Sequence, residues 1–275
     1  MKPQLALEIA GDTDPGCVRP NNEDSFSVDE EIGLFVVADG MGGHNSGEVA
    51  SGLATENIRN FARHFLGDGK NELPPGADPM APARESQLVF CVKNANTIIY
   101  EKGRAMPKDA GMGTTVVAAL VDTKAVTVAH VGDSRLYLFR KGRLEQLTED
   151  HSLVGDQVKR GLITPEEASH SNLQNILTRA VGAEADVKVD VATHPLLPGD
   201  VLLLASDGLT KMMSDPEIAA VIAADGAPKA VVPRLIEKSR AAGGYDNVTV
   251  VAIRVAPKPP GGNGLKGIVS KLLGS

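Results

Sequence analysis

A series of apolar runs, each standing next to an aspartate, constrains this chain most. Four acids share that placement: Asp39 after residues 34–38, Asp133 after 126–132, Asp207 after 201–206, and Asp246 just before 248–253. A carboxylate at the tip of a buried strand is held by a rigid element and still reaches water. Several such groups brought together form an oxygen-only site, which suits hard cations such as magnesium or manganese. The pattern predicts a β-rich fold that carries a metallohydrolase site.

Asp-Gly is also a common β-turn signal, so Asp39-Gly40 or Asp207-Gly208 alone is more readily explained as a turn. Here two such pairs follow strongly apolar runs, and Gly132-Asp133 and Asp246-Asn247 add to them. This repetition favours a functional site over a set of unrelated turns.

Strand-like and helix-like segments come in blocks, which predicts a layered α/β or α+β domain. Apolar spacing and a Pro near a helix start predict helices over 49–65, 88–99, 216–224 and 229–241. Short β-rich runs predict strands over 114–121, 125–131, 135–139, 187–191, 200–205 and 247–255. Lys141-Gly142 is expected to close a hairpin.

The remaining segments are expected to be loops or a tail. Residues 67–84 read as a surface loop, and the polar stretch after His151 reads as a mobile excursion from the core. The catalytic domain is expected over 1–256. Residues 257–275 then form a Pro/Gly linker and a tail that is either a short amphipathic helix or frayed.

The net charge is −7, from 28 Lys and Arg against 35 Asp and Glu, and no long basic block occurs, so nucleic acid is not an expected partner. Cys17 and Cys91 form no metal or disulfide framework. Residues 1–10 lack the features of a signal peptide, and no apolar stretch is long enough for a transmembrane segment. A cytoplasmic, monomeric protein is expected.

The glycine-rich segment 40–47 follows a strand, but Asn45 stands where a dinucleotide-binding turn requires its third glycine. The glycines are better explained as letting the Gly40 carbonyl approach a cation. His44 is interpreted as a hydrogen-bonding residue, with proton transfer as the alternative.

Arg19 precedes the acids Glu23 and Asp24. It is either a surface ion-pair partner or, if the acids hold metal, a bidentate clamp for a phosphoryl group. No Gly-x-Ser-x-Gly motif occurs, and neither cysteine lies in a nucleophile setting, so a covalent mechanism is disfavoured.

Six motifs, at 19–26, 36–47, 111–115, 132–135, 206–209 and 245–249, together resemble bacterial metal-dependent serine/threonine protein phosphatases of the PPM or type 2C family. The likeness spans residues 10–255. It implies an α/β sandwich of two mainly antiparallel sheets, face to face and flanked by helices, with a flap at about 151–175 beside the active site.

The resemblance also implies roles for site residues. Asp39, the Gly40 carbonyl, Asp207 and Asp246 match the core ligands of two manganese or magnesium ions, with Asp39 bridging them. Glu23 and Asp24 match outer acids, Asp133 matches the position of a third, weaker metal, and Arg19 matches the phosphate-binding arginine.

The implied reaction is hydrolysis of phosphoserine and phosphothreonine by direct attack of a water activated by the two metals, in signalling that opposes a serine/threonine kinase. The chain has Met41 where many eukaryotic relatives have a proton-donating His, which leaves the general acid open between metal-bound water, the favoured candidate, and His44. Three alternatives remain: a catalytically weak pseudophosphatase that binds partners, a hydrolase of small phosphate esters, and a structural role through the tail.

Overall fold

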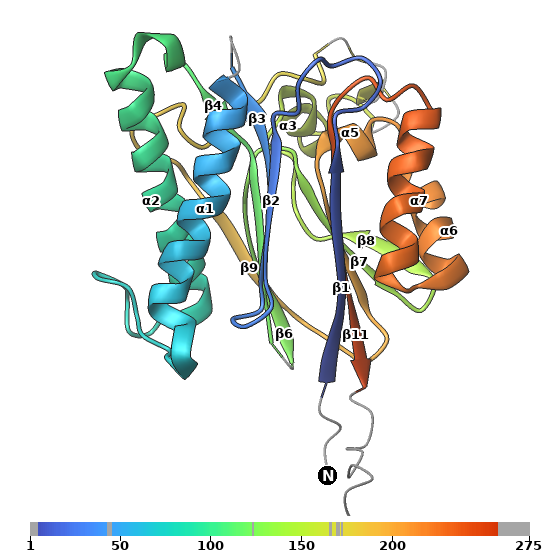
Figure 1. Cartoon of the computed structure of the whole chain (residues 1–275), viewed down its shortest axis with the longest axis horizontal. Helices are drawn as coiled ribbons and strands as arrows, with labels where there is room; N and C mark the ends of the chain where they lie inside the picture. Colours follow the sequence, from blue (N-terminus) through green and yellow to red (C-terminus); the bar gives the residue numbers. More distant parts are fainter. Residues whose placement is uncertain are drawn as a thin grey trace, which may run out of the picture.

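The computed structural model describes residues 5–42, 46–122, 124–164, 167–168, 171 and 173–257. In this part of the chain, two antiparallel sheets lie face to face, and helices cover their outer faces (Figure 1). The sandwich expected from the sequence is confirmed.

The two sheets draw their strands from distant parts of the chain. The first has the order β1 (Leu5–Asp14), β11 (Val248–Pro257), β10 (Val201–Ala205), β7 (Arg135–Arg140) and β8 (Arg143–Gln146). The second has the order β2 (Asp24–Asp29), β3 (Leu34–Met41), β5 (Val116–Val121), β6 (Ala125–Val131) and β9 (Asp190–Pro195), with β4 (Gly113–Thr114) paired to β3. β1 and β11 pair along their whole length, from Leu5 opposite Pro257 to Asp14 opposite Val248.

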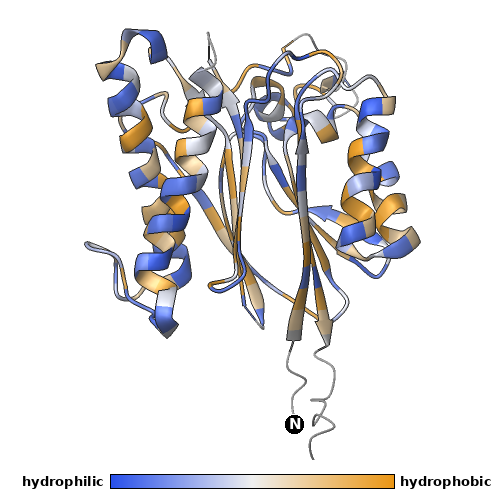
Figure 2. Ribbon diagram, in the orientation of Figure 1, coloured by the Kyte–Doolittle hydropathy of each residue, from blue (hydrophilic) through white to orange (hydrophobic). Residues whose placement is uncertain are grey.

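Alternate residues of the central strands face different layers. In β3, Phe35 and Val37 pack between the sheets, whereas Val36 packs toward the helices. In β10, Leu202 packs between the sheets and Leu203 packs outward. This period of two is that of strands buried on both faces. Accordingly, hydrophobic colour concentrates along the strands in Figure 2, whereas the helices mix both kinds of residue.

The long helices are confirmed where they are expected. α1 (Ser46–Leu66) and α2 (Ala83–Ala105) cover the second sheet, and α6 (Asp215–Asp225) and α7 (Pro228–Ala241) cover the first (Figure 1). The structure also has two short helices, α3 (Leu153–Lys159) and α5 (Asp207–Thr210), and 3-10 turns at Gly67–Gly69 and Pro107–Asp109. α6 begins with a capping box between Ser214 and Glu217, which satisfies free backbone donors of its first turn.

The predicted hairpin is confirmed, since Lys141 and Gly142 connect β7 and β8 with φ angles of 50° and 81°. Positive φ at both central residues is the mark of a type I′ turn, whose twist matches that of paired strands.

The strand predicted at 187–191 is wrong in position, because β9 runs from Asp190 to Pro195. Pairing with β6 begins only at His130 opposite Asp190, so the residues before Asp190 have no partner strand there. Val187 and Val189 are apolar because they pack against the core under α1 and α2. Burial alone therefore produced the strand-like pattern.

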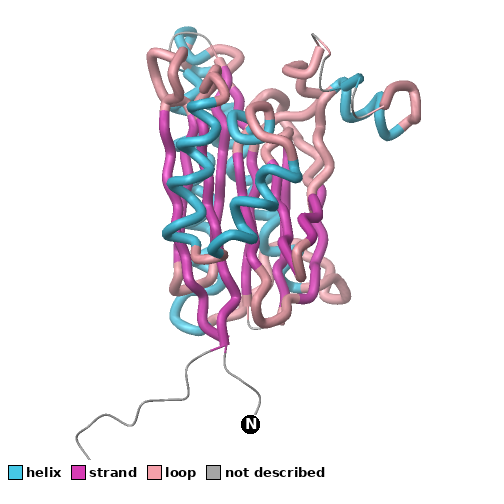
Figure 3. Tube along the Cα trace, turned by 90° about the vertical axis from the view of Figure 1, so that its right-hand side faces the viewer, coloured by secondary structure: helices cyan, strands magenta, loops and turns pink. Residues whose placement is uncertain are grey.

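The segment that begins at His151 leaves the sandwich, as expected, and projects from its upper right corner in Figure 3. It contains α3, which the sequence pattern did not predict, and the Ser152 Oγ caps that helix by accepting the Gly155 N–H at 3.1 Å. A bridge between Ser152 and Leu177 brings the flap back to the body.

Two expectations fall outside the described residues: the role of His44, and the linker and tail beyond Pro257. No helix within the described ranges is long and apolar enough to cross a membrane.

Candidate active site

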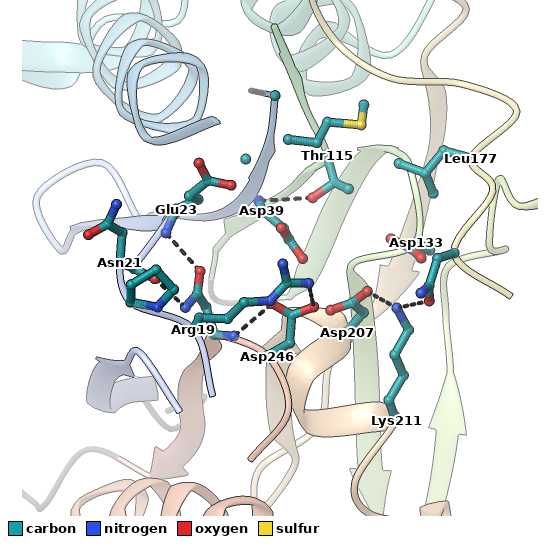
Figure 4. A pocket seen from close by; sticks show the side chains of 16 residues that line it. Arg19, Asn21, Glu23, Asp39, Thr115, Asp133, Leu177, Asp207, Lys211 and Asp246 are labelled. Atoms are coloured by element: carbon teal, nitrogen blue, oxygen red, sulfur yellow. Dashed lines mark hydrogen bonds and ion pairs between the residues drawn. The ribbon is translucent and has the colours of Figure 1, made fainter. Parts of the chain in front are cut away.

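The four aspartates meet at one end of the sandwich, where strands of both sheets end. Asp39 lies on β3, Asp133 follows β6, Asp207 follows β10 as the first residue of α5, and Asp246 precedes β11. All four line one pocket of about 420 Å³. Figure 4 shows Asp39, Asp207 and Asp246 around the same space, with Asp133 at its far side.

Asp39 lies within β3 rather than after it, which corrects its expected place at the end of a strand. The strand continues to Met41 because its last two residues pair with β4. The Asp39 N–H donates to Thr115 Oγ1 at 3.0 Å, and the Thr115 N–H donates to the Asp39 carbonyl at 2.8 Å. These two bonds fix the backbone that carries the carboxylate.

Gly208 brings Asp207 and the loop of Asp246 together. A Cβ atom at Gly208 would lie only 1.9 Å from the carbonyl oxygen of Asn247. Because Asp207 opens a helix and Asp39 lies within a strand, neither Asp-Gly pair forms a β-turn.

Asn247 ties the N-terminal loop to this end of the sandwich. Its side chain accepts the Glu23 N–H at 2.8 Å and donates to the carbonyls of Pro15 (3.0 Å) and Asn21 (2.8 Å). Arg19, in the same loop, donates from Nη2 to Asp246 Oδ2 at 2.8 Å with 54% of its side chain exposed. The guanidinium therefore lies at the rim of the pocket beside a carboxylate (Figure 4).

Glu23 and Asp24 lie in different surroundings. Glu23 lines the pocket, whereas Asp24 stands opposite Asp39 in the β2–β3 ladder and is buried. The Asp24 Oδ2 accepts hydrogen bonds from Ser206 Oγ and Thr249 Oγ1, each at 2.7 Å. Asp24 is thus an acid beneath the pocket, bound by hydroxyl groups from the opposite sheet.

Burial and neighbouring acids raise the pKa values of Asp24, Asp39 and Asp133. Burial, followed by the charges of Asp24 and Asp207, holds the pKa of Asp39 well above its ordinary value. Burial also raises the pKa of Asp24 and of Asp133 to about 7, and Asp207 adds to both shifts. The cluster therefore resists full ionisation until a positive charge joins it.

The donor set fits a divalent cation. Asp207 Oδ1 and Asp24 Oδ1 are buried without a hydrogen-bond partner in the described structure, and such an oxygen costs free energy unless a cation or donor meets it. Carboxylate and carbonyl oxygens are the ligands that magnesium and manganese take. Gly40, whose carbonyl is a predicted ligand, also lines the pocket.

A second cluster, His130, His151 and Asp190, has its ligand atoms within 4.8 Å of one another and is the one group of that compactness among the described residues. Its atoms already have partners: His151 Nδ1 accepts the Gly132 N–H, His151 Nε2 bonds Asp190, and Arg179 also binds Asp190. Burial lowers the pKa of His151 to about 4, so the ring is neutral near pH 7. We interpret this cluster as a structural connection at the base of the flap.

Several supporting residues were not identified from the sequence: Thr115, Ser206, Lys211, Asn247 and Thr249. Four of them lie inside the motifs at 111–115, 206–209 and 245–249: Thr115, Ser206, Asn247 and Thr249. Their place in these motifs is the signal that could have identified them. Lys211 lies four residues after Asp207, at the spacing that places two side chains on one helix face.

The raised pKa values predict that the metal-free protein loses stability as pH rises from about 5 to about 7.5. A carboxyl group with a higher pKa in the folded chain keeps its proton after the unfolded chain has released it, so stability is lost between the ordinary pKa of an aspartate and the raised value. For Asp24 and Asp133 the value is about 7. Thermal unfolding in chelator should show a Tm lower by about 3–10 °C at the higher pH.

Excess manganese should remove most of that fall, because the cation offsets the repulsion. Asp24→Asn, which cannot ionise, should weaken the pH dependence in chelator. A Tm in chelator that is constant or rises over this range would contradict the predicted repulsion.

Comparison with known proteins agrees with this geometry. A family profile described as Protein phosphatase 2C matches residues 19–230. The "Serine/threonine phosphatase stp" of Listeria monocytogenes serotype 4b is 38% identical over 244 residues, covering 88% of this chain and 93% of the relative.

Solved structures show the same likeness over nearly the whole chain. The Mycobacterium tuberculosis serine/threonine phosphatase PstP/Ppp superposes with a TM-score of 0.79 at 35% identity, covering 91% of this chain and 99% of that one. The catalytic domain of the serine threonine protein phosphatase PstP in complex with 2 manganese ions gives a TM-score of 0.76 at 36% identity, covering 92% of this chain and 100% of that one.

Proposed function

The chain belongs to the protein phosphatase 2C family and is a serine/threonine protein phosphatase, and from that premise we propose how its own residues bind cofactor and substrate. The observation that carries the proposal is the convergence of Asp39, Asp207 and Asp246 on one pocket with Arg19 at its rim. Oxygen donors beside an exposed guanidinium suit a phosphate ester held against metal ions.

Two manganese or magnesium ions are the proposed cofactor. Asp39, the Gly40 carbonyl, Asp207 and Asp246 are the proposed ligands, and Glu23 and Asp24 support them. Asp39 is proposed to bridge the ions, because it lies on β3 between Asp24 and the two acids of the other sheet. When bound, the ions lower the pKa of a water enough to make a nucleophile available near neutral pH.

Two cationic side chains of the site have proposed or inferred roles, and both remain protonated near pH 7. Arg19 is proposed to bind two phosphoryl oxygens with its planar fork, and its exposure leaves room for a protein substrate. The pKa of Arg19 is raised by Asp246, and that of Lys211 is raised by Asp207 against the effect of burial. Neither side chain gives up a proton near pH 7, so the leaving serine or threonine oxygen is proposed to take its proton from water.

The substrate class is tested by comparing turnover on a phosphothreonine peptide with turnover on nucleotides and on a small aryl phosphate. We expect the highest kcat/KM on the peptide, because the open rim contacts residues that flank the phosphate. A higher kcat/KM on nucleotides would favour the small phosphate-ester alternative. A pseudophosphatase is disfavoured because all the expected acids are present at the site.

Arg19→Ala should raise KM for the phosphothreonine peptide by about 10–100-fold, with a smaller loss in kcat, because a bidentate ion pair to the phosphoryl group is removed. Inhibition by inorganic phosphate should weaken in parallel. Arg63→Ala, which removes an exposed arginine paired with Asp29, is the matched control and should change neither value. An unchanged KM in Arg19→Ala would reject the clamp.

We also propose a cytoplasmic monomer that opposes a serine/threonine kinase. A free thiol on exposed Cys17 suits a reducing compartment, and a phosphatase of this class reverses what only a kinase installs. Light scattering on the purified chain tests the oligomeric state.

A further inference from the structure

Lys211 places an ammonium group inside the acid cluster. It directly follows α5, four residues after Asp207, and its Nζ forms an ion pair with Asp207 Oδ2. The same Nζ donates to Asn175 Oδ1 at 2.6 Å, and 21% of the Lys211 side chain is exposed. In Figure 4 the side chain of Lys211 rises from below and ends between Asp207 and the side where Asp133 lies.

Asp133 depends on that ammonium group for its charge balance. Its side chain is buried, and no hydrogen bond from a described residue reaches its carboxylate. The neighbouring cations are Lys211 and Arg135, and Arg135 already forms a bidentate pair with Asp150. Lys211 is therefore the cation that Asp133 and Asp207 share.

The charge balance of the whole site also includes Lys211. Six carboxylates belong to it: Glu23, Asp24, Asp39, Asp133, Asp207 and Asp246. When all are ionised, two divalent ions with Arg19 and Lys211 neutralise them completely. A third divalent ion would leave an excess of two positive charges with Lys211 in place, and withdrawal of the ammonium group would halve that excess.

Lys211 also connects the site to the flap. Asn175 lies between α3 and the bridge at Leu177, and both Asn175 and Leu177 line the pocket. Any cation that displaced the ammonium group from Asp207 would also break its bond to Asn175.

We propose that Lys211 is the resident cation of the outer position between Asp207 and Asp133. A third divalent ion binds there only when the ammonium group withdraws, and this releases Asn175 of the flap. The inference rests on the proposed core site of two ions and goes beyond it by giving the outer position to a side chain of this protein.

Manganese binding measured by calorimetry, with free manganese counted by electron paramagnetic resonance, tests the inference on the full chain. The wild-type protein should bind two ions. Lys211→Met, which keeps length but removes charge, should bind a third ion or tighten an existing weak one at least about tenfold. Lys211→Arg should behave as wild type, and Lys211→Met with Asp133→Asn should return to two ions.

Limited proteolysis gives a second readout. The flap of Lys211→Met should be cleaved faster than that of the wild type without any metal, since the bond to Asn175 is lost.

A wild-type protein that binds three ions with similar affinity, or Lys211→Met with two ions and wild-type affinities, would overturn the inference. Absence of any manganese binding by the folded wild type would instead reject the core site itself. Binding of the two core ions by each variant confirms that its pocket is folded.

Discussion

Asp39→Asn should lower kcat on a phosphothreonine peptide by about three orders of magnitude, equivalent to about 4 kcal/mol of barrier. The substitution keeps the shape of the side chain but removes the charge that is proposed to bridge two cations. The backbone of Asp39 is held by Thr115, so the variant should fold normally. Asp207→Asn should have an effect of similar size.

Asp39→Asn should also be more stable than the wild type in chelator. Burial and neighbouring acids raise the pKa of Asp39, so replacement by a neutral amide removes repulsion from the metal-free protein. Asp186→Asn is the control, because Asp186 is exposed, lies outside the pocket and forms an ion pair with Lys93. Turnover near the wild-type rate in both site variants would reject the ligand assignment.

Gly40→Ala should destabilise the protein by about 3 kcal/mol or more and reduce turnover at least about 100-fold. A Cβ atom at this position would lie 2.1 Å from the Gly47 carbonyl oxygen and 2.6 Å from the Glu23 carbonyl oxygen. Both contacts are with backbone, so α1 or β2 would have to move away from β3. The movement would displace the proposed ligands Asp39 and Gly40 together.

Gly52→Ala is the matched control for that substitution. Gly52 lies within α1, and a Cβ atom added there would meet open space, with no neighbouring atom within 4 Å. Alanine should stabilise the helix there by about 0.5–1 kcal/mol and leave turnover unchanged. Chemical denaturation and manganese binding measured on both variants separate the two outcomes. A Gly40→Ala protein with wild-type stability would show that the close approach is not required.

The core acids were predictable because each is adjacent in sequence to the strand that positions it. Asp207 and Asp246 flank β10 and β11, whose apolar runs are plain in the sequence. α1 and α2 were equally legible, because each buries one continuous face against a sheet. In these elements the apolar pattern of the sequence agrees with the burial of the same residues in the structure.

Other parts of the structure depend on pairing across long sequence distances. β1 was not predicted, since Glu8, Gly11 and Asp12 interrupt its apolar pattern and its stability comes from pairing with β11. The hydroxyl groups that bind Asp24 come from Ser206 and Thr249 on the opposite sheet. No spacing within the chain reveals such contacts.

The sequence motifs identified which acids belong to the site but not how deeply each of them is buried. Glu23 and Asp24 are neighbours with one predicted role, yet Glu23 lies just before β2 and Asp24 is its first residue, so their side chains point in different directions. One therefore lines the pocket and the other lies beneath Asp39. Lys211 was missed because a lysine four residues after an aspartate is ordinarily a surface ion pair.

Phosphate release from a phosphothreonine peptide, measured with manganese, with magnesium and with excess chelator, is the decisive experiment for a phosphatase that works through metal ions. We expect turnover with either ion, none in chelator, and recovery when manganese is restored. Turnover that persists in excess chelator, or a folded protein that is inactive with both ions, would contradict the proposed mechanism.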